Sequence, residues 1–445
     1  MYALLAIAIS LVCALIVLPA IGYLKLSLAA FLAAAALVPF PILLWSANAP
    51  NHTGIAYTSP ALTTYGVALL LLALGLASSW QRNSWLFAYA ATVAVYLVVG
   101  LLTVWGGVEA QWAGAIHWAF AVLALIVGYQ LGAQMTQEVH SFMVKVIFAL
   151  LLINAMFCVI QLAGYPVSVF SDQLETHIDN SRPIGTFSHP STLGKFVIIV
   201  MIVVLPALYN KEAGARRVAL WCLALAVPLV AVTLARANLV AVLIAVALWL
   251  LFDRRSRRVT AKRVLLIAGV ALLSAPVIGA TLERFAIDPG GGGRTTIYSA
   301  GLEQLKSNLW MGTGPNYYAE VVGQWDRMTA LGYPLHNTFL YPVAELGIIG
   351  GIVFMSPILV VCSIATIDVL RGGAVGASPW SKAYVATFPG VMIIAMTGWG
   401  MLLGSTLCLW FFAIGVAASK ITRSMVNSAD SRERQRPSLS SERAQ

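Results

Sequence analysis

Residues 218–252 read "VALWCLALAVPLVAVTLARANLVAVLIAVALWLLF" and are apolar almost throughout. As one continuous helix this stretch would be about 52 Å long, whereas the hydrocarbon core of a bilayer is about 30 Å thick. The chain must therefore turn within the stretch, and Arg236 and Asn238 mark the polar point where it can do so. We predict two transmembrane helices joined by a tight turn.

The rest of the chain follows the same pattern. Of its 445 residues, 60% are hydrophobic and 10% are charged, and the mean hydropathy is +0.85. A soluble domain carries roughly 25% charged residues, so the composition excludes a soluble enzyme. It predicts an all-α polytopic membrane protein with about 12–13 transmembrane helices. The apolar runs lie near residues 3–24, 27–45, 62–78, 86–105, 114–133, 143–164, 192–210, 218–235, 237–252, 264–283, 338–367, 383–398 and 401–419.

Positive charge predicts the orientation of these spans. Their alternation places 20 of the 27 Lys and Arg residues on one side, which we assign to the cytoplasm. Two long loops, at about 165–191 and 284–336, then face outward. We expect one transmembrane domain, residues 1–423, followed by a disordered cytoplasmic tail, residues 424–445. Because the basic residues lie between and after the spans, the net charge of +10 does not predict binding to nucleic acid.

No residue cluster in the sequence predicts a metal or a cofactor. The five cysteines lie inside apolar runs without paired spacing, which is typical of buried core residues. There is no Asp-x-Asp pair, no His-Glu-x-x-His and no Cys/His cluster. A site would therefore depend on arginines and a histidine, with Glu320, Asp326 and Glu345 as candidate carboxylates.

Three residues near the predicted outer boundary are the leading candidates for chemistry. Arg236 sits where two spans meet, and a charge so near the apolar layer costs a few kcal/mol and is usually functional; alternatively, it reaches towards lipid headgroups. Arg294 follows four glycines, stands one turn ahead of Tyr298 and begins a predicted amphipathic helix at 294–307. His336 opens the span "HNTFLYPVAELGIIGG", either as a reactive group or as a helix-start hydrogen-bonding residue.

The first outer loop adds further candidates for substrate binding. Its end, "NSRPIGTFSHPSTLGKF", brings Arg182, His189 and Lys195 to the outer boundary within fourteen positions. Basic groups and free N–H donors at a helix start favour an anion. Ordinary helix capping and interfacial anchoring would explain the same residues.

Several of these motifs together resemble the O-antigen ligase and polymerase superfamily, most strongly over residues 180–350. The segment "LARANLVAVL" is similar to the family's Ser-Arg-Gly segment and puts its arginine at Arg236, although Ala235 and Ala237 replace the serine and glycine. The segment "GGGGRTTIYSAGLEQLKSNLWMGTGPNYY" resembles the family's loop and puts a second arginine at Arg294. The spacing in "HNTFLYPVAELGIIG" resembles the ligase pattern, with its histidine at His336 and Asn337 beside it.

The resemblance implies a C-type, metal-independent, inverting glycosyltransferase in the bacterial inner membrane, with its active site facing the periplasm. The donor would be a glycan on undecaprenyl pyrophosphate, and the acceptor a sugar hydroxyl on lipid A-core or on another glycan. His336, Arg294 and Arg236 would be catalytic, and Arg182, His189, Lys195, Tyr298 and Asn337 would bind substrate. Arginine forks match phosphate oxygens, and a neutral histidine can accept the acceptor's proton.

Three other functions stay open at this point. An O-antigen or exopolysaccharide polymerase shares much of the His-Asn spacing with the ligases and differs in its acceptor. A protein oligosaccharyltransferase is a further member of the same broad class. A transporter or lipid flippase also has many spans, but transporters place ionisable groups near mid-membrane in paired halves, and here the charges lie at the outer edge.

Overall fold

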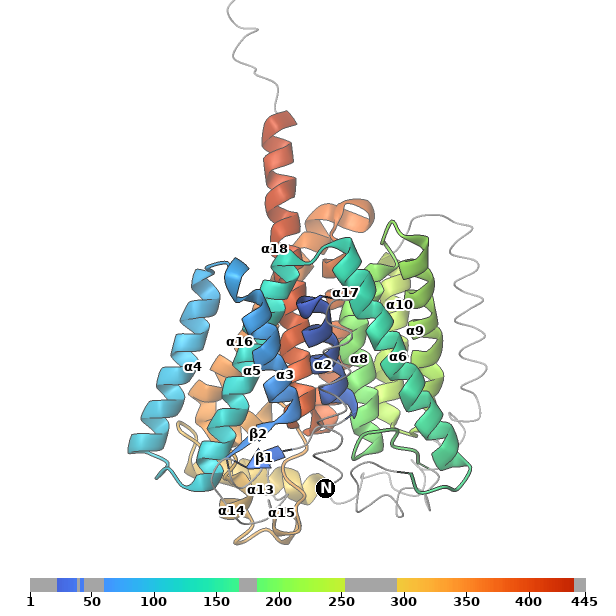
Figure 1. Cartoon of the computed structure of the whole chain (residues 1–445). Helices are drawn as coiled ribbons and strands as arrows, with labels where there is room; N and C mark the ends of the chain where they lie inside the picture. The colour runs from blue at the N-terminus through green and yellow to red at the C-terminus, as the bar shows by residue number, and fades with distance from the viewer. Residues whose placement is uncertain (1–21, 38–40, 44–59, 168–181, 253–293, 436–445) are drawn as a thin grey trace, which may run out of the picture.

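The computed structural model describes residues 22–37, 41–43, 60–167, 182–252 and 294–435. Within these ranges the chain is a bundle of helices (Figure 1). The long helices are α2 (Tyr23–Leu37), α3 (Thr64–Leu76), α4 (Ser84–Thr103), α5 (Glu109–Gln134), α6 (Gln137–Leu162), α8 (Pro190–Ala207), α9 (Ala213–Val232), α10 (Arg236–Phe252), α16 (Leu340–Gly376), α17 (Pro379–Thr397) and α18 (Gly404–Gln435). Shorter elements are β1 (Pro41–Leu43), β2 (Ala61–Thr63), η1 (Ala77–Ser79), α13 (Arg294–Ser307), α14 (Tyr318–Val322), α15 (Arg327–Ala330) and η2 (Gly400–Leu402).

The prediction of an all-α polytopic membrane protein is confirmed. In the part of the chain that the structure describes, seven helices are long and apolar enough to cross a membrane, namely α4, α5, α6, α8, α9, α16 and α18. Helices α2, α3 and α10 are apolar but shorter. The predicted span 264–283 and nearly all of the predicted span 3–24 lie outside the described residues, so the predicted total stays a prediction.

Helix α8 and the first part of α18, from Gly404 to Ile421, form the centre of the bundle, because both are buried almost throughout. Helix α18 packs along α5 at a distance that only small residues permit. A Cβ atom on Gly128 of α5 would lie 2.1 Å from the carbonyl oxygen of Phe412, and one on Gly415 of α18 would lie 2.1 Å from that of Leu125. Such small-residue contacts let transmembrane helices approach closely and gain dispersion energy.

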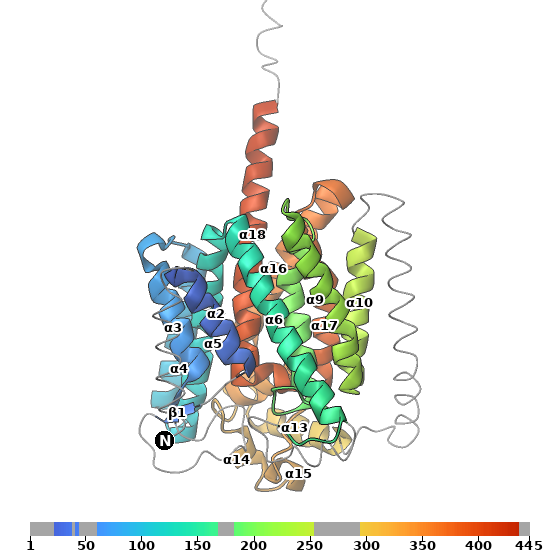
Figure 2. The same cartoon turned by 45° about the vertical axis from the view of Figure 1, so that its right-hand side comes forward.

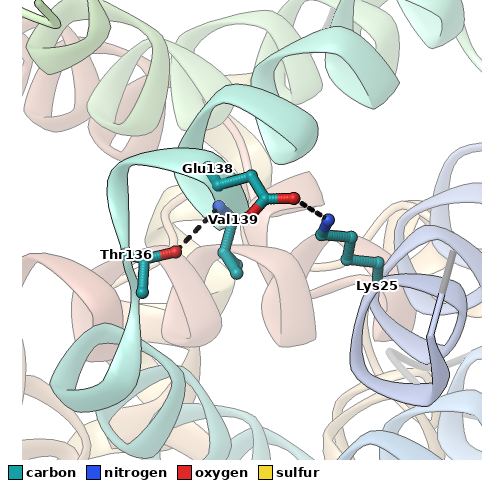
Figure 3. Close-up of polar contacts among 4 residues, drawn as sticks. All are labelled: Lys25, Thr136, Glu138 and Val139. Carbon is teal, nitrogen blue, oxygen red and sulfur yellow. Dashed lines mark hydrogen bonds and ion pairs between the residues drawn. The ribbon is translucent and has the colours of Figure 1, made fainter.

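An ion pair between α2 and α6 identifies one end of the bundle. Lys25 in the first turn of α2 forms an ion pair with Glu138 in the first turn of α6, where Thr136 caps the helix through the Val139 N–H (Figure 3). These two helices therefore begin at the same end. Helix α18 projects beyond the other helices at that end (Figure 1). The alternation of the helices brings the predicted cytoplasmic segments that the structure describes to this end.

The opposite end carries the elements that the sequence predicts to face outward. Helices α13, α14 and α15 lie beyond the ends of the long helices, on the side away from the α18 projection (Figures 1 and 2). The predicted amphipathic helix at 294–307 is confirmed as α13. The predicted breaks are confirmed as well, since α9 ends at Val232 before α10 begins at Arg236, and α17 ends at Thr397 before α18 begins at Gly404.

Two predicted boundaries differ from the structure. The predicted span 27–45 ends as helix at Leu37, and Pro41–Leu43 instead pair antiparallel with Ala61–Thr63. Pro39 and Pro41 disfavour a continuing helix, because proline lacks the N–H and restricts the residue before it. At the other end of the chain, α18 continues to Gln435, so the first part of the predicted disordered tail 424–445 is helical, and residues 436–445 lie outside the described part.

Candidate active site

The turn between α9 and α10 places Arg236 at the first position of α10. Leu234 adopts the left-handed conformation with φ 52°, and the Ala235 N–H donates to Thr233 Oγ1 at 3.3 Å. Few residues other than glycine adopt this conformation, and it reverses the chain within three residues. The half-buried Arg236 is therefore held between the ends of two apolar helices, at the turn that the sequence predicted.

Arg182 reaches the same turn from the first outer loop. Its Nε donates to the carbonyl oxygen of Thr233 at 3.3 Å, across 51 positions of sequence. The side chain is half-buried. A predicted substrate-binding residue and the α9–α10 turn are thus joined by a direct hydrogen bond.

The first turn of α8 joins Lys195 to the start of α10. Lys195 is 4% exposed, and its Nζ donates to Ser191 Oγ at 2.7 Å. Asn238, two positions after Arg236, donates from Nδ2 to the Ser191 carbonyl at 2.8 Å. Lys195 and Arg236 therefore belong to helix starts that share Ser191 and Asn238 as bridging groups.

His189 has the capping role that was the alternative interpretation. Its Nδ1 accepts the Ser191 N–H at 3.0 Å, so the imidazole is the N-cap of α8. The side chain is exposed. It stands beside the basic residues of this end, and its part in substrate binding stays a prediction.

Residues 182–195 and 233–238 together supply Arg182, Lys195 and Arg236 but no Asp or Glu. We call these three residues the basic cluster. Their positions at or near the starts of α8 and α10 add N–H dipoles that also favour negative charge. The charges and N–H donors of this arrangement favour an anion, such as a phosphate, at this end of the bundle.

His336 lies just before α16 with a defined ring orientation. Its half-buried imidazole has Nδ1 at 2.7 Å from the Pro334 carbonyl oxygen. A carbonyl oxygen only accepts, so Nδ1 carries the proton, and in the neutral ring Nε2 holds the lone pair. This tautomer is the one that a general base using Nε2 requires.

Asn337 and Tyr298 contact each other. Asn337 Nδ2 donates to the Tyr298 hydroxyl at 2.6 Å, and its Oδ1 accepts the N–H groups of Phe339 and Leu340 at 2.9 and 3.0 Å. Asn337 therefore caps the start of α16 and ties it to α13. Since Tyr298 is four positions after Arg294, the helix start that carries Arg294 is held next to the His336 segment.

The His336 segment and the basic cluster meet at the break between α17 and α18. Thr338 Oγ1 donates to the Gly398 carbonyl at 2.7 Å, which docks the start of α16 on this break. On its other side the break touches Lys195, because a Cβ atom on Gly400 would lie 2.8 Å from Lys195 Nζ. Two groups of predicted site residues, more than 100 positions apart, are thus joined through Gly398 and Gly400.

The second outer loop packs onto a kink in α16. Gly347 has φ 69° and ψ 178°, and a Cβ atom there would lie 2.0 Å from the Trp310 carbonyl oxygen. The Gly314 N–H donates to the Glu345 carbonyl at 2.7 Å, and the Ile348 N–H to that of Leu309 at 2.8 Å. Gly312 and Gly314 of the loop and Gly347 of α16 therefore all lie at one backbone-to-backbone contact.

The three candidate carboxylates differ in their burial and in their hydrogen bonds. Glu345 is fully buried in α16, while Asp326 Oδ2 caps α15 by accepting the Thr329 N–H at 2.8 Å, and Glu320 is exposed. Burial, followed by the charges of Asp326 and Glu345, raises the pKa of Tyr318. Tyr318 therefore stays protonated near neutral pH. In the described part of the chain no three His, Cys, Asp or Glu side chains gather as a metal site.

Two buried polar residues of α6 were not predicted as site residues. Asn154 and Gln161 lie at 0% and 2% exposure and hydrogen-bond to the segment before α8. They are seven positions apart, which is two helical turns, so they share one face. Two polar residues at that spacing inside an apolar run indicate a buried polar contact, and this pattern could have identified them from the sequence.

Comparison with known proteins finds a family-model match in the central part of the chain. Residues 218–355 match the family model described as O-Antigen ligase. The matched segment begins in α9 and ends in α16, so it includes Arg236, Arg294 and His336. No curated protein matches the chain.

Proposed function

We propose, from the match of residues 218–355 to the O-antigen ligase family model, that the chain transfers a glycan from undecaprenyl pyrophosphate to a sugar hydroxyl. We assign the reaction to the outer face of the bacterial inner membrane. The acceptor we propose is lipid A-core, which makes the protein an O-antigen ligase. The donor, the acceptor and the sidedness are parts of this proposal.

The observation that carries the proposal is the junction between the basic cluster and the His336 segment. Arg182, Lys195 and Arg236 supply positive charge at one end of the bundle, and Thr338 and Gly398 join the His336 segment to the same place. A pyrophosphate leaving group and a sugar hydroxyl need these two kinds of group side by side. The junction lies where long apolar helices end, which suits a lipid-linked donor.

The bond changes follow from these groups. The oxygen of the acceptor hydroxyl attacks the anomeric carbon, and its proton passes to His336 Nε2. The bond from that carbon to the pyrophosphate oxygen breaks, and its electron pair leaves with the pyrophosphate. Arg236 and Arg294 would stabilise that charge by bidentate hydrogen bonds, an effect that is large in a site from which water is excluded. Attack opposite to the leaving group inverts the anomeric configuration.

The contact between Tyr298 and Asn337 supports the assignment of Arg294 to the proposed active site. The hydrogen bond between them holds the start of α13 close to His336. We propose that Tyr298 and Asn337 orient this helix start towards the donor, and that His189 and Lys195 border the pyrophosphate.

Reconstitution tests the proposal. The purified protein in liposomes would be given undecaprenyl pyrophosphate carrying one glycan repeat, together with lipid A-core, without ATP, ion gradient or divalent cation and with a strong chelator. We expect glycan on lipid A-core. Lys306→Ala is a matched control, because it removes an exposed cation that pairs with Glu303 and does not belong to the basic cluster.

The products separate the alternatives. Lengthening of the lipid-linked glycan without transfer to lipid A-core would identify a polymerase, and movement of intact donor across the bilayer would identify a flippase. Activity that a chelator abolishes and a divalent ion restores would contradict the metal-independent mechanism. Absence of any transfer would contradict the proposed function.

A further inference from the structure

Gln161 in the last turn of α6 closes the base of the first outer loop. Its Nε2 donates to the carbonyl oxygens of Val167 and Gly185 at 2.9 and 2.8 Å, and its Oε1 accepts the N–H groups of Ile184 and Gly185 at 2.9 and 3.0 Å. One buried side chain thus serves four backbone groups on both sides of the loop. A Gln side chain has two N–H donors and an oxygen with two lone pairs, so these four hydrogen bonds use its full capacity.

Asn154, on the same face of α6, extends this contact by one residue along the held segment, from Gly185 to Thr186. Its Oδ1 accepts the Thr186 N–H at 3.0 Å, while Thr186 Oγ1 lies 2.7 Å from the Ala36 carbonyl oxygen. Gly185 has φ 63°, and a Cβ atom there would lie 2.4 Å from Asn154 Oδ1. The backbone of residues 184–186 is therefore held against α6 at every residue.

The short link from this backbone to Arg182 is stiff. Pro183 fixes its own φ near −65° and confines the residue before it to extended conformations. The position of the Ile184 N–H therefore largely determines where the Arg182 backbone lies. From there the Arg182 side chain reaches the Thr233 carbonyl beside the α9–α10 turn.

We propose that Gln161 is a positioning residue: by holding Ile184 and Gly185, it places Arg182 in the basic cluster that binds the donor's pyrophosphate. This inference rests on the proposed function. Gln161 does not touch the donor, and it acts through Arg182. Its contribution is to fix in advance the position of a cation that would otherwise have to be ordered when the donor binds.

A matched control is available at the opposite end of the bundle. Gln130 of α5 is also buried and also grips backbone, since it accepts the Gln81 N–H at 2.9 Å and donates to the Gln81 carbonyl at 2.7 Å. Replacing Gln130 by leucine removes similar bonds without approaching the basic cluster. A general loss of stability would affect both variants.

The test is a double-mutant cycle on the full-length protein in liposomes, with undecaprenyl pyrophosphate carrying one glycan repeat as donor. We expect Gln161→Leu to raise the donor KM by about ten-fold, with a smaller change in kcat, and Gln130→Leu to leave KM unchanged. In an Arg182→Ala background, Gln161→Leu should change KM by less than about two-fold. The same effect in both backgrounds, or a parental KM for Gln161→Leu, would overturn the proposal. Gln161→Met, which keeps the volume, serves if the leucine variant does not fold.

A second measurement separates this inference from the proposed function. A nitroxide on Ser188→Cys, an exposed position just beyond the held segment, would be followed in a cysteine-free background. We expect Gln161→Leu to increase its mobility and Gln130→Leu not to do so; an unchanged spectrum would refute the positioning role. A parent that transfers no glycan would contradict the proposed function, while the nitroxide would still report whether Gln161 holds the segment.

Discussion

The imidazole of His336 carries the most specific prediction at the scale of single residues. Because the Pro334 carbonyl fixes the proton on Nδ1, only Nε2 can take the acceptor's proton in the neutral ring. A general base contributes about 10²–10⁴-fold to the rate. We therefore expect His336→Ala to lower kcat within that range while the Kd of the donor, measured by its binding to the protein in detergent, stays near the parental value. Transfer at the parental rate would contradict the role of His336 as the general base.

The two arginines carried over from the family resemblance have a different test. Lysine keeps the charge at Arg236 or Arg294 but loses the planar fork that grips two phosphate oxygens. We expect Arg236→Lys and Arg294→Lys each to lower kcat/KM for the donor by at least about ten-fold, whereas Lys306→Ala should stay near the parent. Steady-state transfer in liposomes measures this. Near-normal turnover of both lysine variants would show that bidentate phosphate recognition is the wrong explanation.

At the scale of elements, the kink in α16 joins the second outer loop to the membrane part. Gly347→Ala would force a side chain into a left-handed backbone conformation and into the Trp310 carbonyl oxygen. We expect a lower midpoint of thermal unfolding in detergent and a loss of transfer, because the loop that follows α13 can no longer pack. Gly214→Ala in α9 is the control, since nothing lies within 4 Å of its added Cβ atom. Equal midpoints for the two variants would contradict the importance of this contact.

The elements themselves show what sequence could and could not predict. The fixed length of a span and the polar residues within it located the α9–α10 turn, and four glycines marked the start of α13. The separate apolar runs 383–398 and 401–419 located the α17–α18 break. The early end of α2 was missed, since hydropathy does not register that Pro39 and Pro41 stop a helix. The positions of Arg236 and His336 at helix starts were predictable, but their link through Gly398 and Gly400 was not. Contacts between distant segments depend on packing that local patterns do not encode.

The whole molecule brings polar segments from separate parts of the chain to one end of the bundle. The start of α8, the α9–α10 turn, the start of α16 and the α17–α18 break contact one another there. They can do so because α8 and the first part of α18, which are central and nearly fully buried, fix the positions of the other helices. A site assembled in this way depends on the bundle as a unit. Substitutions in the α5–α18 contact should therefore change the geometry of the site, although no residue of that contact belongs to the site.

The last prediction concerns the orientation of the whole molecule. The end that carries Lys25, Arg82 and Lys211–Arg217 should face the cytoplasm, because basic residues are retained on that side during insertion. The opposite end, with α13, should then face the periplasm. We expect a membrane-impermeant thiol reagent, applied to cells with a permeabilised outer membrane, to label Thr295→Cys in α13 and not Gly214→Cys at the start of α9. Both cysteines should react after lysis, which controls for accessibility. Labelling of Gly214→Cys in intact inner membranes would reverse the orientation and would place the basic cluster and His336 on the side where a periplasmic acceptor could not reach them.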